Sequence, residues 1–276
     1  MYKDKIVVFD LDETLGHFVE LGIFTDCLKH FYSYKKIPYT LNQTDFNIIL
    51  DLYPEFLRPN IIDILNFLKD KKEKNICSKV MIYTNNQGPR EWAEYIKNYF
   101  HYKLNYPLFD QIIAAFKVNG KRVELGRTSH DKCYSDFVRC TKVPQNAQIC
   151  FLDDTIHDDM IHENVFYINV KPYINDVIFK EMIHRYVQTD LYKKYQGNIS
   201  LEEFNNFMLN NMAKYHYSVV TKSHEEILLD EILSKKILQH LKTFFKRDSD
   251  SDSGIGTRKN RRKRKHNKTL KIFSEI

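Results

Sequence analysis

Two aspartates, Asp10 and Asp12, follow an apolar run near the start of the chain. The run Ile6–Phe9 is short and rich in β-branched side chains, which predicts a strand buried in a parallel sheet. Side chains at positions i and i+2 of an extended backbone point to the same side. Two carboxylates held this close repel each other unless a cation or a proton relieves the repulsion. The spacing therefore predicts a site for a divalent metal ion.

Polar side chains also follow two later apolar runs. Thr84 comes directly after the run at 80–83. The pair Asp153 and Asp154 comes directly after the run at 148–152. In an open α/β sheet, ligands bind outside the carboxyl ends of the strands, where such side chains gather. We therefore expect these residues to lie beside the first acid pair.

These residue types are the ones that phosphoryl transfer through a carboxylate needs. Asp10 is the candidate nucleophile, because an aspartate can attack phosphorus and form an aspartyl-phosphate. Asp12 can protonate the departing alcohol and later activate water. Thr84 and a lysine can hold the negative equatorial oxygens of the phosphoryl group. Asp10, the backbone carbonyl of Asp12, and Asp153 or Asp154 offer the hard oxygen ligands that Mg²⁺ prefers.

The lysine is chosen from three candidates, Lys117, Lys121 and Lys132, which all precede the last acid pair. Lys132 is favoured because it opens a helix predicted over Ser129–Arg139, directly before the strand at 148–152. That position places it at the same edge of the sheet. A solvated surface lysine is the competing interpretation for each of the three.

The other motifs also have interpretations without catalysis. The Thr-Asn-Asn at 84–86 is ordinary turn chemistry. The acids at 153–154 can cap the N-terminus of a helix. Their positions after apolar strands favour the catalytic interpretation.

The segment Asp10–His17 resembles the first motif of the haloacid dehalogenase superfamily. More narrowly, it is similar to that of the RNA polymerase II carboxy-terminal domain phosphatases and their NLI-interacting-factor relatives, which reads Asp-Leu-Asp-Glu-Thr-Leu-x-His. Arg58-Pro59 resembles the Arg-Pro that begins a helix in that family, Tyr83-Thr84 its second motif, and Leu152–Asp154 its last motif. The resemblance covers roughly residues 5–170.

The resemblance implies a Mg²⁺-dependent phosphatase that hydrolyses phosphomonoesters through an aspartyl-phosphate. It also implies that Asp154 is the side-chain metal ligand and that Asp153 supports both Asp154 and the lysine. The leading substrate is a phosphoprotein, with phosphoserine of the RNA polymerase II tail first. The candidate substrate-binding residues are Thr14, Thr84, Asn85 and Lys132.

Two departures from the family stand in the sequence. The family places a small β-insertion after the first motif, whereas residues 18–50 look partly helical and rich in Phe and Tyr. The family follows its second-motif Thr with small residues, whereas Asn85–Gly88 stands here. Two other functions therefore stay open. One is a related phosphatase acting on a nucleic-acid 3′-phosphate or a small metabolite. The other is a non-catalytic protein that binds nucleic acid or a nuclear partner through a basic tail.

Strands alternating with helices predict an α/β fold with a Rossmann-like parallel sheet. Helices are predicted over Glu20–Tyr34, Asn60–Lys72 and Pro89–Phe100, a strand over Asp45–Leu52, and a hairpin turn at Asn119-Gly120. We expect a haloacid dehalogenase-like domain at 1–174 with an insertion at about 17–57. A helical extension at 175–245 and a disordered basic tail at 246–276 complete the predicted organisation.

The net charge of +6 belongs to the predicted tail. Residues 246–276 hold 11 basic and 4 acidic side chains, which leaves 31 basic and 32 acidic ones in the rest of the chain. The run Arg258–Lys265 suits a nuclear localisation signal read by an import receptor, or a nucleic-acid contact. A solvated tail without a receptor is the alternative.

The expected location is intracellular, in the cytoplasm, the nucleus or both. No apolar run has the length of a bilayer span, and the first strand begins at once, so we expect neither a transmembrane helix nor a signal peptide. The cysteines are scattered and form no Cys-x-x-Cys pair, which supports neither a disulfide framework nor a zinc site.

Overall fold

The computed structural model describes residues 4–246 and 269–271, which form two compact units. Unit one comprises Met1–Leu15, Pro59–Pro172 and Leu228–Ile276. Unit two comprises Gly16–Arg58 and Tyr173–Ile227. The predicted insertion and most of the predicted helical extension therefore form one unit together, although they are far apart in the sequence.

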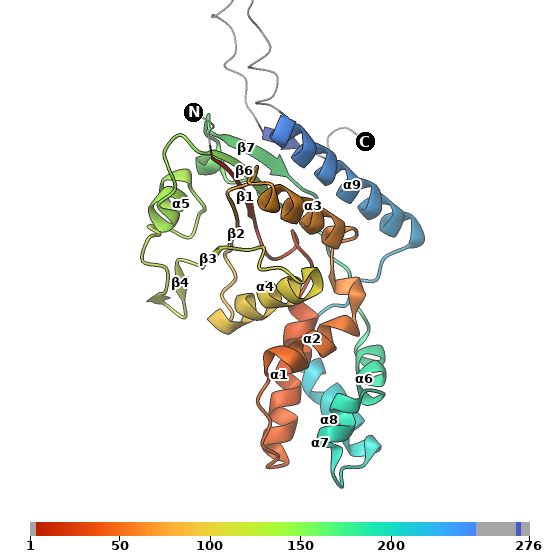
Figure 1. The fold of residues 1–276 in the computed structure, drawn as a ribbon. Helices are drawn as coiled ribbons and strands as arrows, with labels where there is room; N and C mark the ends of the chain where they lie inside the picture. Colours follow the sequence, from red (N-terminus) through yellow and green to blue (C-terminus); the bar gives the residue numbers. More distant parts are fainter. Residues whose placement is uncertain (1–3, 247–268, 272–276) are drawn as a thin grey trace, which may run out of the picture. The chain divides into compact units, whose positions relative to one another are not determined.

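Unit one is built on a parallel sheet with the strand order β3-β2-β1-β6-β7-β8 (Figure 1). The strands are β1 (Lys5–Phe9), β2 (Lys79–Tyr83), β3 (Gln111–Ile113), β6 (Gln148–Asp153), β7 (Val165–Asn169) and β8 (Thr269–Lys271). The runs are short and apolar, and β1, β6 and β7 are buried on both faces, as strands of a parallel sheet are. The predicted α/β fold with a parallel sheet is confirmed.

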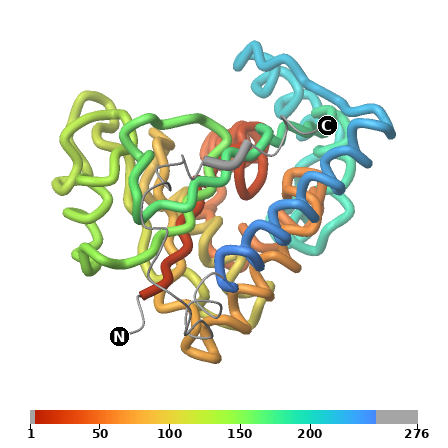
Figure 2. The backbone as a smooth tube through the Cα atoms, turned by 90° about the horizontal axis from the view of Figure 1, so that it is seen from above, coloured from red at the N-terminus to blue at the C-terminus, as the bar shows by residue number. Residues whose placement is uncertain are grey.

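Helices cover both faces of this sheet. They are α3 (Ile61–Glu73), α4 (Arg90–Leu104), α5 (Tyr134–Thr141) and α9 (His224–Lys246). Figure 2 shows α5 on one side of β1 and the main length of α9 on the other. Side chains alternate between the faces of a strand, so neighbouring residues of β1 and β7 face different helices.

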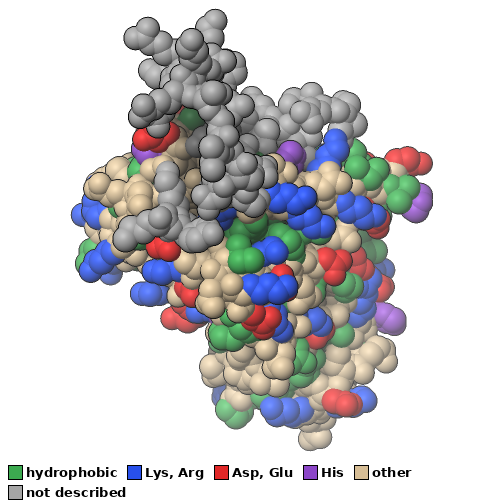
Figure 3. All heavy atoms as spheres, turned by 45° about the horizontal axis from the view of Figure 1, so that its top comes forward, with side chains coloured by type: hydrophobic (Ala, Val, Ile, Leu, Met, Phe, Trp, Pro, Cys, Tyr) green, Lys and Arg blue, Asp and Glu red, His purple; other side chains and the backbone are tan. Residues whose placement is uncertain are grey.

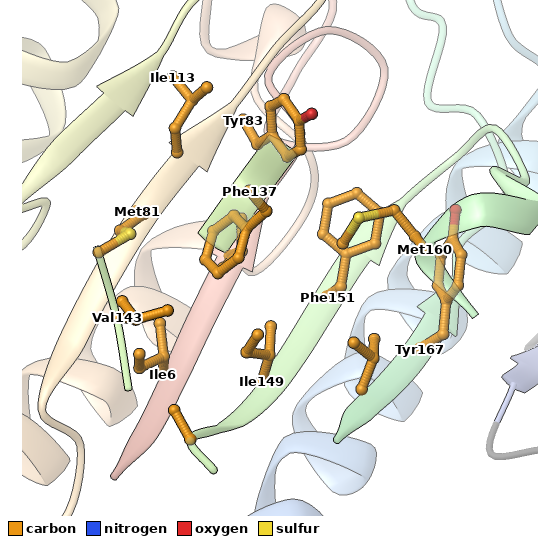
Figure 4. Packing of buried hydrophobic residues seen from close by; sticks show 13 residues of the cluster. Ile6, Met81, Tyr83, Ile113, Phe137, Val143, Ile149, Phe151, Met160 and Tyr167 are labelled. Carbon is orange, nitrogen blue, oxygen red and sulfur yellow. The ribbon is translucent and has the colours of Figure 1, made fainter. Parts of the chain in front are cut away.

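One face of the sheet carries the core cluster drawn in Figure 4. There Ile6, Ile149 and Tyr167, from three neighbouring strands, share one cluster with Phe137 of α5. On the opposite face, Phe166 of β7 contacts Phe244 of α9, with ring centroids 5.9 Å apart. Both faces are therefore dry, and the polar side chains of the strands are left at the strand ends.

The strand predicted over Asp45–Leu52 is wrong, because this segment forms helix α2 (Gln43–Asp51). The Asn42 side chain caps the helix by accepting a hydrogen bond from the Asp45 backbone N–H. The buried residues Phe46, Ile49 and Leu50 have helical spacing, which the exposed Ile48 hides in the sequence.

Several local predictions are confirmed. The predicted helices at Glu20–Tyr34, Asn60–Lys72 and Pro89–Phe100 correspond to α1 (Val19–Tyr34), α3 and α4. The turn at Asn119-Gly120 joins β4 (Lys117–Val118) to β5 (Lys121–Arg122) as an antiparallel hairpin. Asn119 has φ +49° and Gly120 has φ +76°, the positive values that a two-residue hairpin turn needs.

The predicted disordered tail falls mainly on residues 247–268 and 272–276, which lie outside the described residues, as does the basic run at 258–265. Thr269–Lys271 form β8, a strand that we did not predict. Among the described residues, no helix combines the length and the apolar character that crossing a bilayer requires. On the face drawn in Figure 3, basic and acidic side chains are interspersed.

Unit two is helical. Its helices are α1, α2, α6 (Phe179–Val187), α7 (Asp190–Gln196) and α8 (Leu201–Ala213). Aromatic side chains fill its interior, and Phe31 contacts Phe204 while Phe24 contacts Tyr186. The described residues also contain two short 3₁₀ helices, η1 (Pro54–Phe56) in unit two and η2 (Asp158–Met160) in unit one.

A buried carboxyl group lies inside unit two. Glu20 of α1 is fully buried, and its Oε2 accepts a hydrogen bond of 2.8 Å from the Val177 backbone N–H. The pKa of Glu20 is raised to about 8, chiefly by burial and also by the neighbouring Asp176 carboxylate, against lowering by the Val177 N–H and by His17. The folded state therefore favours the neutral form of this side chain.

Replacement of Glu20 by Gln is expected to stabilise the protein at alkaline pH. The raised pKa of Glu20 means that folded stability falls as pH rises from its ordinary value of 4.5 towards about 8, whereas Gln does not ionise. Thermal unfolding at about pH 5 and about pH 9 is expected to show a higher Tm for the Gln variant only at the higher pH. Each kcal/mol of added stability raises Tm by about 2–4 °C. Glu202→Gln on the surface of α8 is the control. Equal gains at both pH values would contradict this account.

Candidate functional site

The carboxyl ends of β1, β2 and β6 surround a cavity of about 260 Å³ within unit one. It is lined by Asp10, Asp12, Glu13, Asn85, Asn86, Lys132, Asp153, Asp154, Thr155 and His157. The register of the parallel strands pairs Phe9 with Leu152, so the residues after each strand meet. Of the predicted site residues, Asp10, Asp12, Asn85, Lys132, Asp153 and Asp154 line this cavity, whereas Thr14 and Thr84 are not in its lining.

Lys132 joins the first and last acid motifs. Its Nζ donates to Asp10 Oδ1 and, at 2.7 Å, to Asp153 Oδ2. The Lys132 side chain is 2% exposed, and the Asp153 side chain is 1% exposed. A buried ammonium between two carboxylates is satisfied in charge and in hydrogen bonding, which holds all three groups in place.

The electrostatics of this group follow from burial and from the single cation. Burial raises the pKa of Asp10 well above its ordinary value, and the attraction of Lys132 only partly offsets this effect. Burial alone would also raise the pKa of Asp153, but Lys132 and His157 bring it below its ordinary value. Burial would lower the pKa of Lys132, yet the two carboxylates raise it. Lys132 is therefore charged, whereas burial favours the neutral form of Asp10 and the cation favours its ionised form.

Three carboxylates have the spacing of a metal site. Oxygen atoms of Asp10, Asp153 and Asp154 all lie within 4.8 Å of one another. Burial raises the pKa of Asp154 to about 6, and the charges of Asp153 and Glu13 contribute. A cation would relieve this repulsion, so the donor set fits Mg²⁺, which prefers oxygen ligands.

The predicted metal set also includes Asp12, whose side chain lies differently. Asp12 Oδ2 accepts a hydrogen bond of 2.9 Å from Asn86 Nδ2, and Asp12 is not one of the three clustered carboxylates. Its predicted role as a backbone carbonyl ligand stays a prediction. The Asn86 contact instead fixes the orientation of the Asp12 carboxylate in the lining of the cavity.

The two acids that follow β6 differ in their partners. Asp153 Oδ1 accepts from the Thr155 backbone N–H at 2.8 Å, while its Oδ2 faces Lys132 and lies 3.5 Å from His157 Nε2. Asp154 Oδ1 accepts from the Thr14 hydroxyl at 3.3 Å. Both oxygens of Asp153 are thus engaged. Thr14, a predicted substrate-binding residue, is buried against an acid of the metal set.

The loop after β2 carries the predicted hydroxyl. The Thr84 side chain is buried, and its Oγ1 accepts a hydrogen bond of 2.9 Å from the Asn86 backbone N–H. Asn85 is exposed, and it lines the cavity. The Thr-Asn-Asn segment is thus a hydrogen-bonded turn, as the non-catalytic interpretation holds, and this turn forms one wall of the cavity.

Of the three candidate lysines, Lys132 is the one that lines the cavity, whereas Lys117 and Lys121 belong to the β4–β5 hairpin. The helix predicted over Ser129–Arg139 begins later, because Cys133 caps α5 by accepting from the Asp136 backbone N–H. Lys132 therefore precedes the helix and lies in an irregular segment, which lets its side chain reach between two strand ends.

Arg127 also organises this wall of the cavity, and it was not predicted from the sequence. It is fully buried, and its guanidinium donates to the Thr84 carbonyl at 3.1 Å and to Asn85 Oδ1 at 2.8 Å. It also donates to the carbonyls of Ala114 and His130 and lies 4.9 Å from the centre of the Tyr83 ring. No sequence motif marks Arg127, because three of its four acceptors are backbone carbonyls, which any sequence provides.

Arg127→Met is expected to destabilise unit one and to loosen the turn at Thr84. The substitution removes four hydrogen bonds that a buried, charged donor makes, so we expect a loss of at least about 2 kcal/mol in the free energy of unfolding. Chemical denaturation measures the loss, and Arg90→Met, the same substitution at an exposed arginine of α4, is the control. A loss in Arg127→Met no larger than in the control would contradict the role assigned to Arg127.

No protein-family model matches the chain, and no curated protein matches it. The likeness to the haloacid dehalogenase superfamily therefore depends on the motif residues and their order. The structure adds a parallel α/β sheet, with a lysine and three aspartates brought together at the ends of its strands.

Proposed function

We propose that this protein is a Mg²⁺-dependent phosphatase of the haloacid dehalogenase superfamily, which hydrolyses phosphomonoesters through an aspartyl-phosphate. The observation that carries the proposal is the buried Lys132, which contacts Asp10 and Asp153 beside Asp154. A nucleophilic carboxylate, a fixed cation and a set of metal ligands are the parts that phosphoryl transfer requires.

The chemistry proceeds in two steps. The Asp10 carboxylate attacks phosphorus, the bond from phosphorus to the alcohol oxygen breaks, and that oxygen takes a proton from Asp12. The ionised Asp12 then accepts a proton from a water molecule, whose oxygen attacks the aspartyl-phosphate. Inorganic phosphate leaves, and Asp10 is restored as a carboxylate.

The remaining side chains hold charge. Lys132 balances the equatorial phosphoryl oxygens, and the turn at Thr84 and Asn85 provides hydrogen-bond donors beside them. Asp10 and Asp154 would hold Mg²⁺, with the carbonyl of Asp12 as the predicted further ligand, and the bound ion would supply positive charge against the phosphoryl group. Asp153 keeps Lys132 in place.

A substrate panel with and without Mg²⁺ tests the proposal. Its members are 4-nitrophenyl phosphate, a phosphoserine peptide of the polymerase-tail type, a 3′-phosphorylated oligonucleotide and a sugar phosphate. We expect Mg²⁺-dependent phosphate release that a chelator stops, with the phosphopeptide the best of the biological substrates. Preference for the oligonucleotide or the sugar phosphate would replace the phosphoprotein assignment. Absence of turnover on every member would instead favour a non-catalytic interaction protein.

A further inference from the structure

A second cavity, of about 290 Å³, lies in unit one next to the first. Its walls come from the first turns of α4, the segment after β3 and the β4–β5 hairpin. Apolar side chains predominate in it, among them Ala93, Ile112, Ala114, Ala115, Val118 and Val123. The charged residues Arg90, Glu94 and Glu124 also line it, as do residues of the loop after β2: Thr84, Asn86, Gly88 and Pro89.

The space exists because small side chains line it. Ala93 is a largely buried residue of α4, and Ala114 and Ala115 follow β3. A larger apolar side chain at any of these positions would extend into the cavity. Such a concave apolar surface meets water unless a ligand covers it, so its presence favours binding of an apolar group.

The two cavities share a residue. Asn86 lines both, and its Nδ2 donates to the carboxylate of Asp12. Asp12 is the proposed proton donor to the departing alcohol, so the alcohol oxygen must lie on the Asp12 side of the first cavity. The organic group attached to that oxygen can then extend past Asn86 into the second cavity.

We propose that the second cavity binds the organic part of the phosphomonoester and selects an apolar group of one or two rings. This inference rests on the proposed function. The volume of the second cavity, about 290 Å³, fits such a group, since an apolar cavity of about 150 Å³ holds one benzene ring. The apolar side chains that predominate in the lining disfavour a sugar, because hydroxyls packed against them would lack partners. The occupant is therefore an aryl group or an apolar side chain next to the phosphate.

Binding of phosphonates, which cannot be hydrolysed, tests the subsite without turnover. Calorimetry in the presence of Mg²⁺ is expected to show phenylphosphonate binding at least about tenfold more tightly than methylphosphonate, because the ring buries apolar surface. Ala93→Leu is expected to reduce this preference to about threefold or less, by filling the cavity. Ala213→Leu, the same substitution at an exposed position of α8, is the control and is expected to retain the preference.

Turnover gives the second readout. The ratio of kcat/KM for 1-naphthyl phosphate to that for glycerol phosphate is expected to fall at least about fivefold in Ala93→Leu but not in Ala213→Leu. Ala114→Val provides a smaller filling change if the Leu variant does not fold. Equal affinity of the two phosphonates for the unaltered protein would overturn the subsite, as would a preference that both folded filling variants retain. A phosphonate preference without hydrolysis of any ester would instead overturn the phosphatase proposal and leave the subsite standing.

Discussion

Asp10→Asn is expected to abolish phosphate release from 4-nitrophenyl phosphate, with a fall in kcat of at least about 10³-fold. The amide cannot form the aspartyl-phosphate, and it also removes one carboxylate of the metal set. The folded protein is expected to survive the change. Burial already disfavours the ionised form of Asp10, since it raises the pKa of this side chain, and Asn is neutral.

The matched control is Asp131→Asn, which makes the same chemical change at an exposed aspartate next to Lys132. Its turnover is expected to remain within about twofold of that of the unaltered protein. Acid quenching during turnover is expected to trap a phosphoryl group on the unaltered protein and none on the Asn variant. Retention of more than about a tenth of the activity by Asp10→Asn would overturn the nucleophile assignment.

The sheet could be predicted because its strands are short apolar runs separated by helical spacing and clear turn residues. Asn119-Gly120 is such a turn, and the hairpin forms there. The segment Asp45–Leu52 could not be assigned from its pattern, since the exposed Ile48 makes an amphipathic helix look like a continuous apolar strand. In the structure, the Asn42 cap stabilises the start of helix α2. In the prediction, this local capping signal counted for less than the run of apolar residues.

The unit boundaries could not be predicted for a different reason. Residues 16–58 and 173–227 pack as one unit, and nothing local in either segment specifies its partner. Aromatic contacts such as Phe31–Phe204 create that unit, and they join positions far apart in the chain. Local spacing predicts an element, but not which distant element covers its apolar face.

The residues of the candidate site also fall into two groups, those that could be predicted from the sequence and those that could not. Asp10, Thr84, Asp153 and Asp154 could be located because each ends or follows a strand, and strand ends meet at one edge of a parallel sheet. Arg127 could not, since it acts on backbone carbonyls and leaves no pattern in the sequence. The Asp12 carboxylate was predicted in the right cavity, whereas its partner Asn86 was not predicted at all.

Lys132→Met is expected to be the most destabilising substitution at the site. Met occupies a similar volume but carries no charge, so Asp10 and Asp153 would be left buried without their shared cation. Removing one partner of a buried ion pair costs about 3–5 kcal/mol. Chemical denaturation measures this loss, and kcat for 4-nitrophenyl phosphate is expected to fall by about 10²-fold or more. Lys142→Met, at an exposed lysine after α5, is the control and is expected to change the free energy of unfolding by less than about 0.5 kcal/mol.

The double variant Asp10→Asn with Lys132→Met separates the ion pair from its chemistry. If the lysine is held chiefly by charge, removing one acid together with it leaves only Asp153 unpaired, and part of the stability lost in Lys132→Met returns. We expect a coupling free energy of at least about 1 kcal/mol between the two positions, measured by denaturation of all four proteins. Activity stays abolished in the double variant, because the nucleophile is absent. Additive losses of stability would contradict the buried pair and, with it, the structural basis of the proposed phosphoryl site.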